Sequence, residues 1–135
     1  MMKVGIYKEV QIDTSHRLLH YKGKCANLHG HRWKVEVWME GEPDPATQIL
    51  IDYSLIKQIV DKYDHQIILN RDDPMVPRIQ EFHAVITTPG DPTSELIAAI
   101  IRDDLYQVCR DLGIKATIPK IRVWESPTSC AELRE

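Results

Sequence analysis

Apolar and polar residues alternate along several stretches of the chain, which is the pattern of strands that bury one face. Residues 4–12 predict a first strand with apolar side chains at even positions, and residues 32–40 a second with apolar side chains at odd positions. Residues 120–125 predict a third strand, and residues 128–133 a short fourth. The first two strands are expected to pair antiparallel, because the polar connection of residues 14–28 shows no crossover helix.

Two other stretches carry apolar residues at the 3.6-residue period of an amphipathic helix. The first follows Asp52, whose carboxylate can cap a helix, and its apolar positions continue to Tyr63. The second covers residues 93–112; an Asp-Pro-Thr start signal leads into it and Gly113 stops it. The order β-β-α-α-β-β predicts an α+β fold, a single domain of residues 1–135 with an antiparallel sheet and both helices packed on one face.

The segment of residues 71–91 has the least regular pattern. It contains three prolines and one glycine, although residues 84–87 could form a short strand. A connection of this length in a compact domain is often a lid or the wall of a pocket. A neutral insertion is an equally open interpretation.

Composition narrows the class of protein. A net charge of −3 over 135 residues gives no basic footprint, so no nucleic-acid partner is expected. No apolar run approaches the roughly 18 residues of a membrane span, so no membrane partner is expected either. The cysteine count of three is odd and predicts reduced thiols in a cytoplasmic protein rather than a disulfide framework.

Strand parity can bring three histidines together. His29 and His31 project from the same face of an extended strand, and this is the face that Trp33 and the following odd positions bury. His16 has the parity of Ile12, so it reaches the same place if the first strand continues and the two strands pair. Zinc binds neutral imidazole, and catalytic zinc sites use three protein ligands with the fourth position open. The pattern therefore predicts a zinc site.

The three cysteines and the isolated histidines have different expectations. Cys25 can be a fourth ligand that makes the zinc structural, or a free thiol that acts as a base or nucleophile once ionised. Spacing does not decide between these, and an inert buried thiol is the least favoured alternative in so polar a loop. Cys109 lies beside the apolar stripe of the second helix and is expected in the core. His20 and His83 are expected at the surface.

Two acidic positions also carry candidate chemistry. Asp64 and His65 are adjacent, and a carboxylate beside an imidazole can raise its basicity and relay a proton. As a bare dipeptide this is a weak signal, and a pair at a helix end is the commoner meaning. Glu125 shares the parity of Ile121 and Val123, so a carboxylate ends the third strand on its core-facing side. Because a buried carboxylate needs a partner, a ligand rich in N–H groups is one explanation, and escape to solvent at the strand end is the other.

Taken together, these motifs resemble the 6-pyruvoyl-tetrahydropterin synthase superfamily, and most closely its 6-carboxy-tetrahydropterin synthase branch in queuosine biosynthesis. The resemblance covers nearly the whole chain, and three residues between the cysteine and the His-Gly-His favour the carboxy branch. The motifs that carry it are Ser15-His16-Arg17-Leu18, Cys25-x-x-x-His29-Gly30-His31, Ile51-Asp52-Tyr53, Asp64-His65-x-x-x-Leu69-Asn70, Pro92-Thr93-Ser94-Glu95 and Glu125.

The resemblance implies roles for the residues of these motifs. Cys25 would be the general base, and Asp64 and His65 would complete a proton relay. Glu125 would anchor the pterin ring through its paired N–H donors. The implied zinc ligands are His16, His29 and His31, and Thr93 and Ser94 would contact the ring through backbone or hydroxyl groups.

The resemblance also implies a fold, an assembly and a reaction. The fold would be the tunnelling fold, in which subunits join their sheets into a barrel, usually as hexamers with active sites at subunit interfaces. The chain would be a zinc-dependent lyase that converts 7,8-dihydroneopterin triphosphate to 6-carboxy-5,6,7,8-tetrahydropterin, releasing acetaldehyde and triphosphate. The alternatives are a 6-pyruvoyl-tetrahydropterin synthase, which only eliminates triphosphate, and a non-catalytic relative that binds zinc and pterins.

Overall fold

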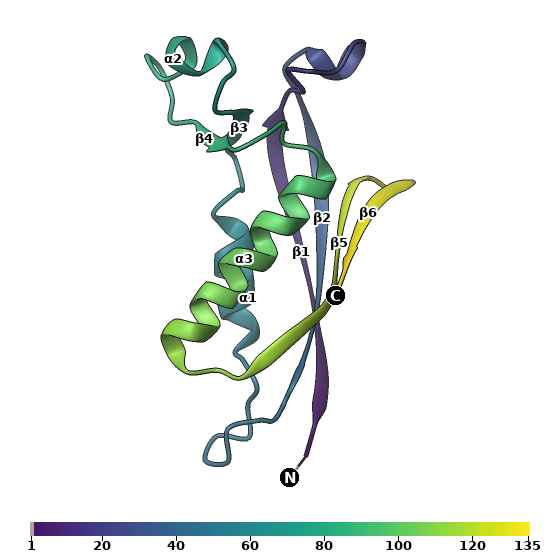
Figure 1. Ribbon diagram of the computed structural model, residues 1–135, viewed down its shortest axis with the longest axis vertical. Coiled ribbons are helices and arrows are strands. Elements are labelled where there is room, and N and C mark those ends of the chain that lie inside the picture. Colours follow the sequence, from purple (N-terminus) through teal and green to yellow (C-terminus); the bar gives the residue numbers. More distant parts are fainter. Residues whose placement is uncertain (1) are drawn as a thin grey trace.

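The computed structural model describes residues 2–135, which form one twisted sheet in the order β4-β3-β1-β2-β5-β6 (Figure 1). Four strands make up most of it: β1 (Val4–His16), β2 (His29–Gly41), β5 (Ala116–Ser126) and β6 (Ser129–Arg134). Neighbours among these four are antiparallel, as the connection between the first two strands and the order of the elements predicted. Both β1 and β2 extend past their predicted ends, so that the connection between them shrinks to residues 17–28.

At the β4 edge the sheet differs from the predicted antiparallel sheet, because two strands there are parallel. β3 (Ile67–Asn70) runs parallel to the end of β1, and β4 (Ile86–Thr88) runs parallel to β3. A wholly antiparallel sheet in β-β-α-α-β-β order is therefore wrong here, because these two strands and α2 (Met75–Ile79) lie between the long helices. β3 has only four residues and three in a row are buried, so it has no alternation of the kind that marks a half-exposed strand.

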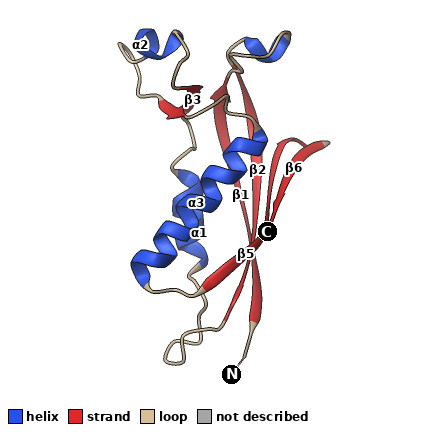
Figure 2. Ribbon diagram, in the orientation of Figure 1, coloured by secondary structure: helices blue, strands red, loops and turns tan. Residues whose placement is uncertain are grey.

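Two helices cover one face of the sheet, α1 (Tyr53–Asp61) and α3 (Ser94–Leu112) (Figure 2). Both begin at the predicted caps: the Asp52 carboxylate accepts a hydrogen bond from the Ser54 N–H, and the Thr93 hydroxyl accepts one from the Leu96 N–H. α3 ends at Gly113, which has the left-handed conformation that favours glycine. The predicted helices and their common side of the sheet are confirmed.

The hydrophobic core lies between these helices and the sheet. Its sheet side comes from the even positions of β1 and the odd positions of β2, together with Ile121 and Val123 of β5. Cys109 belongs to this core, as predicted, and the three cysteines are free thiols. Among the described residues no helix is long and apolar enough to cross a membrane.

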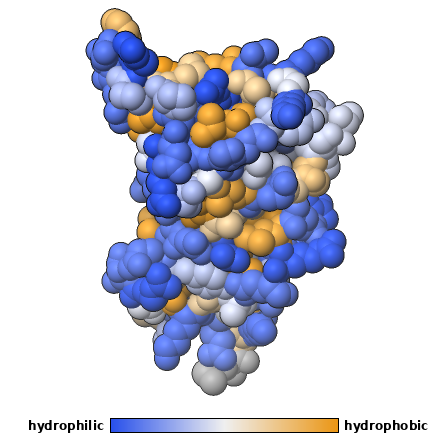
Figure 3. All heavy atoms as spheres, turned by 45° about the horizontal axis from the view of Figure 1, so that its top comes forward, coloured by the Kyte–Doolittle hydropathy of each residue, from blue (hydrophilic) through white to orange (hydrophobic). Residues whose placement is uncertain are grey.

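One end of the molecule gathers the segments that carry the candidate chemistry. The end of β1, the start of β2, the turn Lys24–Ala26, β3, β4 and α2 all lie there, opposite the N-terminus (Figure 1). Figure 3 turns this end toward the viewer and shows small apolar patches separated by polar side chains. The histidines thus lie at an irregular, largely polar end of the sheet.

Candidate metal centre and its surroundings

Strand pairing brings three histidines into one cluster. His16 at the end of β1 is paired with His29 at the start of β2, and Thr14 is paired with His31. The ring centroids of His16 lie 4.7 Å from those of His29 and 5.3 Å from those of His31, and the His29 and His31 centroids are 4.8 Å apart. One nitrogen from each ring lies within 4.8 Å of the others. The predicted convergence is confirmed.

Backbone carbonyl groups determine which nitrogen of the His16 and His29 rings faces the centre. His16 Nδ1 lies 2.7 Å from the Pro92 carbonyl oxygen, and His29 Nδ1 lies 2.6 Å from the Asn27 carbonyl oxygen. A carbonyl oxygen only accepts, so both Nδ1 atoms carry the proton and both Nε2 atoms present a lone pair. The Nε2 atoms of His16 and His31 are buried without a hydrogen-bond partner.

This arrangement fits a metal ion. Buried nitrogen lone pairs need a partner, and imidazole rings oriented by carbonyl acceptors are the usual ligands of zinc. The group that could hold a metal within residues 2–135 consists of these three histidines and does not include Cys25. Three ligands leave a fourth position open for another molecule.

Burial keeps these rings in the form that binds metals. Desolvation lowers the pKa of His16 to about 4, since its side chain is almost fully buried. Desolvation also lowers the pKa of His31. Both rings are therefore neutral at pH 7, as a zinc ligand must be.

Glu125 reaches the same centre from the end of β5. Its Oε1 atom lies 3.5 Å from His16 Nε2, and one third of its side chain is exposed. Glu125 and His31 both line a hollow of about 490 Å³ that also has Lys34 and Trp124 on its wall. The carboxylate thus faces a space beside the three histidines, on the side of the strand that its parity indicated.

Cys25 lies in a short 3₁₀ turn, Lys24–Ala26, between β1 and β2. Its side chain is half-buried, and its carbonyl oxygen accepts a hydrogen bond from the Leu18 N–H at 2.9 Å. This bond ties the turn back to the residues that follow His16.

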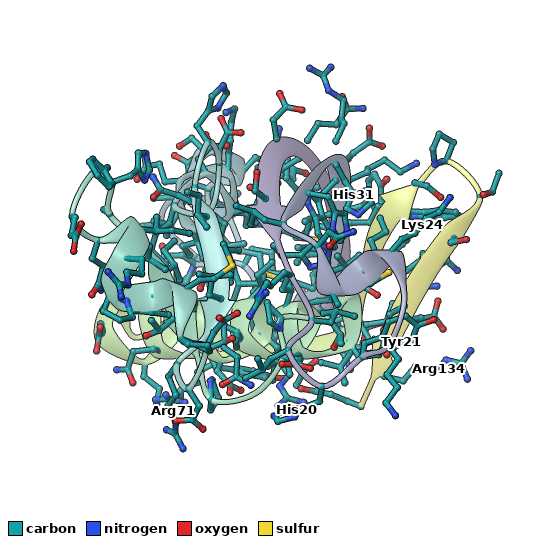
Figure 4. The ribbon with its side chains drawn as sticks, turned by 90° about the horizontal axis from the view of Figure 1, so that it is seen from above. His20, Tyr21, Lys24, His31, Arg71 and Arg134 are labelled. Carbon is teal, nitrogen blue, oxygen red and sulfur yellow. The ribbon has the colours of Figure 1, made fainter. Side chains whose placement is uncertain are left out.

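In Figure 4 His31 lies among closely packed side chains, whereas His20 and Arg71 point away from the molecule. The exposed His20 and His83 agree with their predicted surface positions.

Asp64 and His65 occupy the turn between α1 and β3, at the edge of β1. Asp64 Oδ1 accepts a hydrogen bond from the Asp13 N–H at 2.7 Å, and the His65 N–H donates to the Asp13 carbonyl oxygen at 2.7 Å. The first of these bonds, assisted by His65, lowers the pKa of Asp64. His65 Nδ1 lies 3.0 Å from Asp64 Oδ2, and the imidazole is largely exposed. The pair is formed, and it lies outside the histidine cluster.

His65 has a backbone conformation that indicates a constraint. Its φ is 56°, in the left-handed region that few residues other than glycine adopt. This conformation places its ring on the rim of a hollow of about 480 Å³ that His31 also lines. The hollow therefore connects the neighbourhood of the Asp64–His65 pair with that of the histidine cluster.

The hydroxyl groups of Thr93 and Ser94 are engaged within their own helix. Thr93 Oγ1 caps α3, and Ser94 Oγ donates to Glu95 Oε1 at 2.7 Å. The preceding residue, Pro92, is the one whose carbonyl oxygen contacts His16. The segment therefore reaches the centre through its backbone.

The structure also places polar residues around the centre that sequence reasoning did not single out. They are Arg17, Asp73 and Asp91, and they link the residues after His16 to the segment of residues 71–91. Arg17 and Asn70 belong to motifs that carry the family resemblance, but neither residue was predicted to have a functional role. Asp73 had no signal and Asp91 stood only in the start signal of the second helix, because an aspartate beside a proline is common in turns.

The fold and this centre define an α+β protein with a three-histidine cluster at one end of its sheet that could hold a metal ion. The family model of 6-pyruvoyl tetrahydropterin synthase matches residues 5–135, and the chain belongs to this family.

Relatives and solved structures agree with that assignment. The 6-carboxy-5,6,7,8-tetrahydropterin synthase of Haemophilus influenzae is 32% identical over 143 residues, covering 96% of this chain and 98% of that protein. The enzyme of the same name from Rickettsia bellii is 25% identical over 134 residues, covering 93% and 96%. The 6-pyruvoyl tetrahydropterin synthase of Caenorhabditis elegans superimposes with a TM-score of 0.67 at 24% identity, covering 100% of this chain and 97% of that one. A variant of the Plasmodium vivax enzyme gives 0.71 at 18% identity, covering 100% and 99%. The last two establish similarity of fold.

Proposed function

We propose that the chain is a zinc-dependent lyase that converts 7,8-dihydroneopterin triphosphate to 6-carboxy-5,6,7,8-tetrahydropterin, releasing acetaldehyde and triphosphate on the route to queuosine. The observation that carries this proposal is the cluster of three histidines beside Glu125, in which one nitrogen of each ring lies within 4.8 Å of the others and the buried Nε2 atoms of His16 and His31 have no hydrogen-bond partner. The names of relatives at 25% and 32% identity favour the carboxy product.

His16, His29 and His31 would hold the zinc ion. When bound, zinc supplies Lewis-acid chemistry that lowers the pKa of hydroxyl groups on the substrate side chain. The ring orientations support this assignment, since Nδ1 of two rings is already engaged with carbonyl oxygens. The burial of His16 strengthens electrostatic effects at that side of the cluster, since a buried site has a lower dielectric constant than water.

Cys25 is the proposed general base, and Asp64 and His65 the proposed proton relay. As a thiolate Cys25 would take a proton from the substrate side chain, and His65 would return one. The Asp64 carboxylate would stay ionised, because the Asp13 N–H lowers its pKa, and it would orient the His65 ring through their contact. Loss of triphosphate would follow from these proton transfers, and cleavage of the side chain would consume one molecule of water.

Glu125 is the proposed anchor of the pterin ring. Its carboxylate faces a hollow beside the histidines, and two oxygens can accept from the amino group and the ring N–H of a pterin. Thr93 and Ser94 are proposed to contact the ring through their backbone, since their hydroxyls are engaged in capping α3 and in bonding Glu95.

We further propose a cytoplasmic homo-oligomer, a hexamer by its resemblance, built from single domains of residues 1–135 with active sites between subunits. The exposure of His65 and its position outside the histidine cluster support this arrangement. In such an assembly Cys25 and the Asp64–His65 pair of one site would belong to different subunits.

Product analysis tests the reaction. The purified protein, loaded with zinc, is incubated with 7,8-dihydroneopterin triphosphate, and its products are separated by chromatography and identified by mass spectrometry. We expect a carboxypterin and an equal amount of acetaldehyde. A pyruvoylpterin would show that the chain only eliminates triphosphate, and unchanged substrate would show that it binds pterins without turnover. Zinc removal with a chelator should abolish turnover, and added zinc should restore it.

A further inference from the structure

We infer that Arg17, Asp73 and Asp91 form a clamp that positions His16 and the Cys25 turn, and that the segment of residues 71–91 exists to supply its two carboxylates. This inference rests on the proposed zinc site. It gives a role to residues 71–91, for which the sequence pattern allowed either a lid or pocket wall or a neutral insertion.

Asp73 is the buried half of the clamp. Its side chain is fully buried, and the Arg17 guanidinium donates to it through Nε at 2.6 Å and Nη2 at 2.9 Å. Asp73 Oδ1 also accepts the Met75 N–H at 2.8 Å. A buried carboxylate is costly unless it is paired in this way, so the pair rigidly joins the segment to the residue that follows His16.

Arg17 extends the clamp to the turn that carries Cys25. Its Nη1 atom donates to the Ala26 carbonyl oxygen at 3.4 Å. The next residue, Leu18, donates its N–H to the Cys25 carbonyl oxygen. The guanidinium therefore links three segments: the end of β1, the Cys25 turn and the stretch before α2.

Asp91 is the second carboxylate of the clamp. It accepts the N–H groups of Leu19 at 3.0 Å and His20 at 2.8 Å, and the side-chain amide of the buried Asn70 at 2.9 Å. Its partner at position 20 is the backbone, since the His20 ring points away from the molecule in Figure 4. These bonds hold Asp91 from two directions, so its main chain has little freedom.

Pro92, the residue after Asp91, connects the clamp to His16. Pro92 has a fixed φ, and its carbonyl oxygen contacts His16 Nδ1 at 2.7 Å. Holding Asp91 therefore holds the carbonyl that selects the His16 tautomer and points Nε2 at the cluster. Residues that orient a metal ligand in this way commonly change metal affinity 10- to 100-fold when they are replaced.

Zinc affinity of conservative variants tests the clamp. Asp91→Asn keeps the shape but replaces one acceptor oxygen with a donor, and Arg17→Lys keeps the charge but removes the two-pronged contact. We expect both to bind zinc about 10- to 100-fold more weakly than the unmodified protein, in competition with a chromophoric chelator. Cobalt bound in place of zinc should show an altered visible spectrum, because the direction of His16 changes.

Two control variants separate positioning from general stability. Arg122→Lys makes the same substitution in an ion pair with Glu132, away from the cluster, and Ile101→Val trims a buried position of α3. Both should bind zinc with unchanged affinity, and thermal unfolding of the metal-free proteins is measured alongside. If Asp91→Asn does not fold, the zinc affinity of Arg17→Lys still tests the clamp.

The outcomes separate this inference from the function on which it rests. Full zinc affinity and an unaltered cobalt spectrum in both clamp variants would overturn the clamp alone. An equal loss of affinity in Ile101→Val would also overturn it, since the effect would then follow stability. Failure of the unmodified protein to bind zinc would overturn the metal site and the clamp together.

Discussion

At the scale of single residues, Cys25 is the side chain on which the proposed chemistry depends most. It is half-buried in the turn between β1 and β2 and is not a member of the group that could hold a metal. We expect Cys25→Ala to lower turnover by about 10²- to 10⁴-fold, the usual contribution of a general base, and to retain its zinc. Steady-state product formation and zinc content per chain measure the two effects.

The exposed Cys130 on β6 provides the matched control for that experiment. Cys130→Ala removes an exposed thiol on the edge strand β6, two strands away from β2, and it should leave both turnover and zinc content unchanged. Zinc lost from Cys25→Ala would contradict the prediction, because the thiol would then be a fourth ligand of a closed structural site.

The pKa of His16 predicts how metal-free protein responds to acid. The pKa is lowered from 6.5 to about 4 in the folded state, so below pH 6.5 the unfolded chain binds a proton that the folded chain does not. The stability of the folded state is therefore complete above pH 6.5, falls as the pH decreases toward 4, and stops changing through this group below that. Integrated over this interval, the loss is on the order of 3 kcal/mol.

Urea unfolding of chelator-treated protein between pH 7 and pH 4.5 measures this loss. His31, whose pKa is also lowered by burial, adds to it in the same direction. In His16→Gln the free energy of unfolding should depend less steeply on pH over this interval. An equally steep dependence in that variant would assign the effect to other groups.

Strand parity predicted these histidines because one rule, the alternation of faces along a strand, was sufficient for them. The same rule placed Glu125 toward the core side of β5. It has no bearing on Asp73 and Asp91, which belong to irregular backbone whose course depends on contacts with β1. Their position became visible only when the ends of β1 and β3 were brought together.

At the scale of elements, the start of α3 combines a helix cap with the approach to the metal centre. Thr93 caps the helix through its hydroxyl, and Pro92 supplies the carbonyl for His16. We expect Thr93→Ala to lower the free energy of unfolding by about 1 kcal/mol, the usual cost of a lost N-cap. Thr93→Ser retains the acceptor oxygen and should therefore keep most of the free energy of unfolding that Thr93→Ala loses.

Urea unfolding of the metal-free variants checks this expectation, with Asp52→Ala at the start of α1 as the comparison. Both alanine variants should lose similar stability, but only Thr93→Ala alters the neighbourhood of His16. Unchanged stability in Thr93→Ala would show that its hydroxyl bond to Leu96 contributes nothing to the helix.

The long elements were predictable from the sequence; of the short ones, β6 was predicted as residues 128–133 and β4 overlaps the possible strand of residues 84–87, whereas β3 and α2 were not predicted. β1, β2, α1 and α3 have periods that extend over many residues, and their caps are local signals. β3 and β4 are too short to show a period, and they form because the end of β1 offers a free edge. α2 contains Pro77, which reads as a breaker but is tolerated within the first turn of a helix.

At the scale of the whole molecule, the sheet has one covered and one uncovered face. The helices bury the core side, while Tyr7, Trp38 and Trp124 lie on the other side among charged residues. Glu36 on that side is nevertheless buried, because Tyr7 and Trp124 donate hydrogen bonds to it. A sheet with an uncovered face and two free edges is suited to joining other copies of the chain.

Complementation between two inactive variants tests whether one site uses residues of two subunits. Cys25→Ala lacks the proposed base, and His65→Asn lacks the proposed relay while keeping a residue that tolerates positive φ. Each variant alone should be inactive. Co-assembled in equal amounts, they should recover about a quarter of the unmodified activity, because in a symmetric assembly that fraction of interfaces pairs an intact Cys25 with an intact His65. Activity is measured after subunits are mixed by joint refolding, and Cys25→Ala mixed with the Cys25→Ala/His65→Asn double variant serves as the inactive control. A mixture as inactive as that control would place Cys25 and His65 of each site in the same subunit, since no exchange of partners could then restore them.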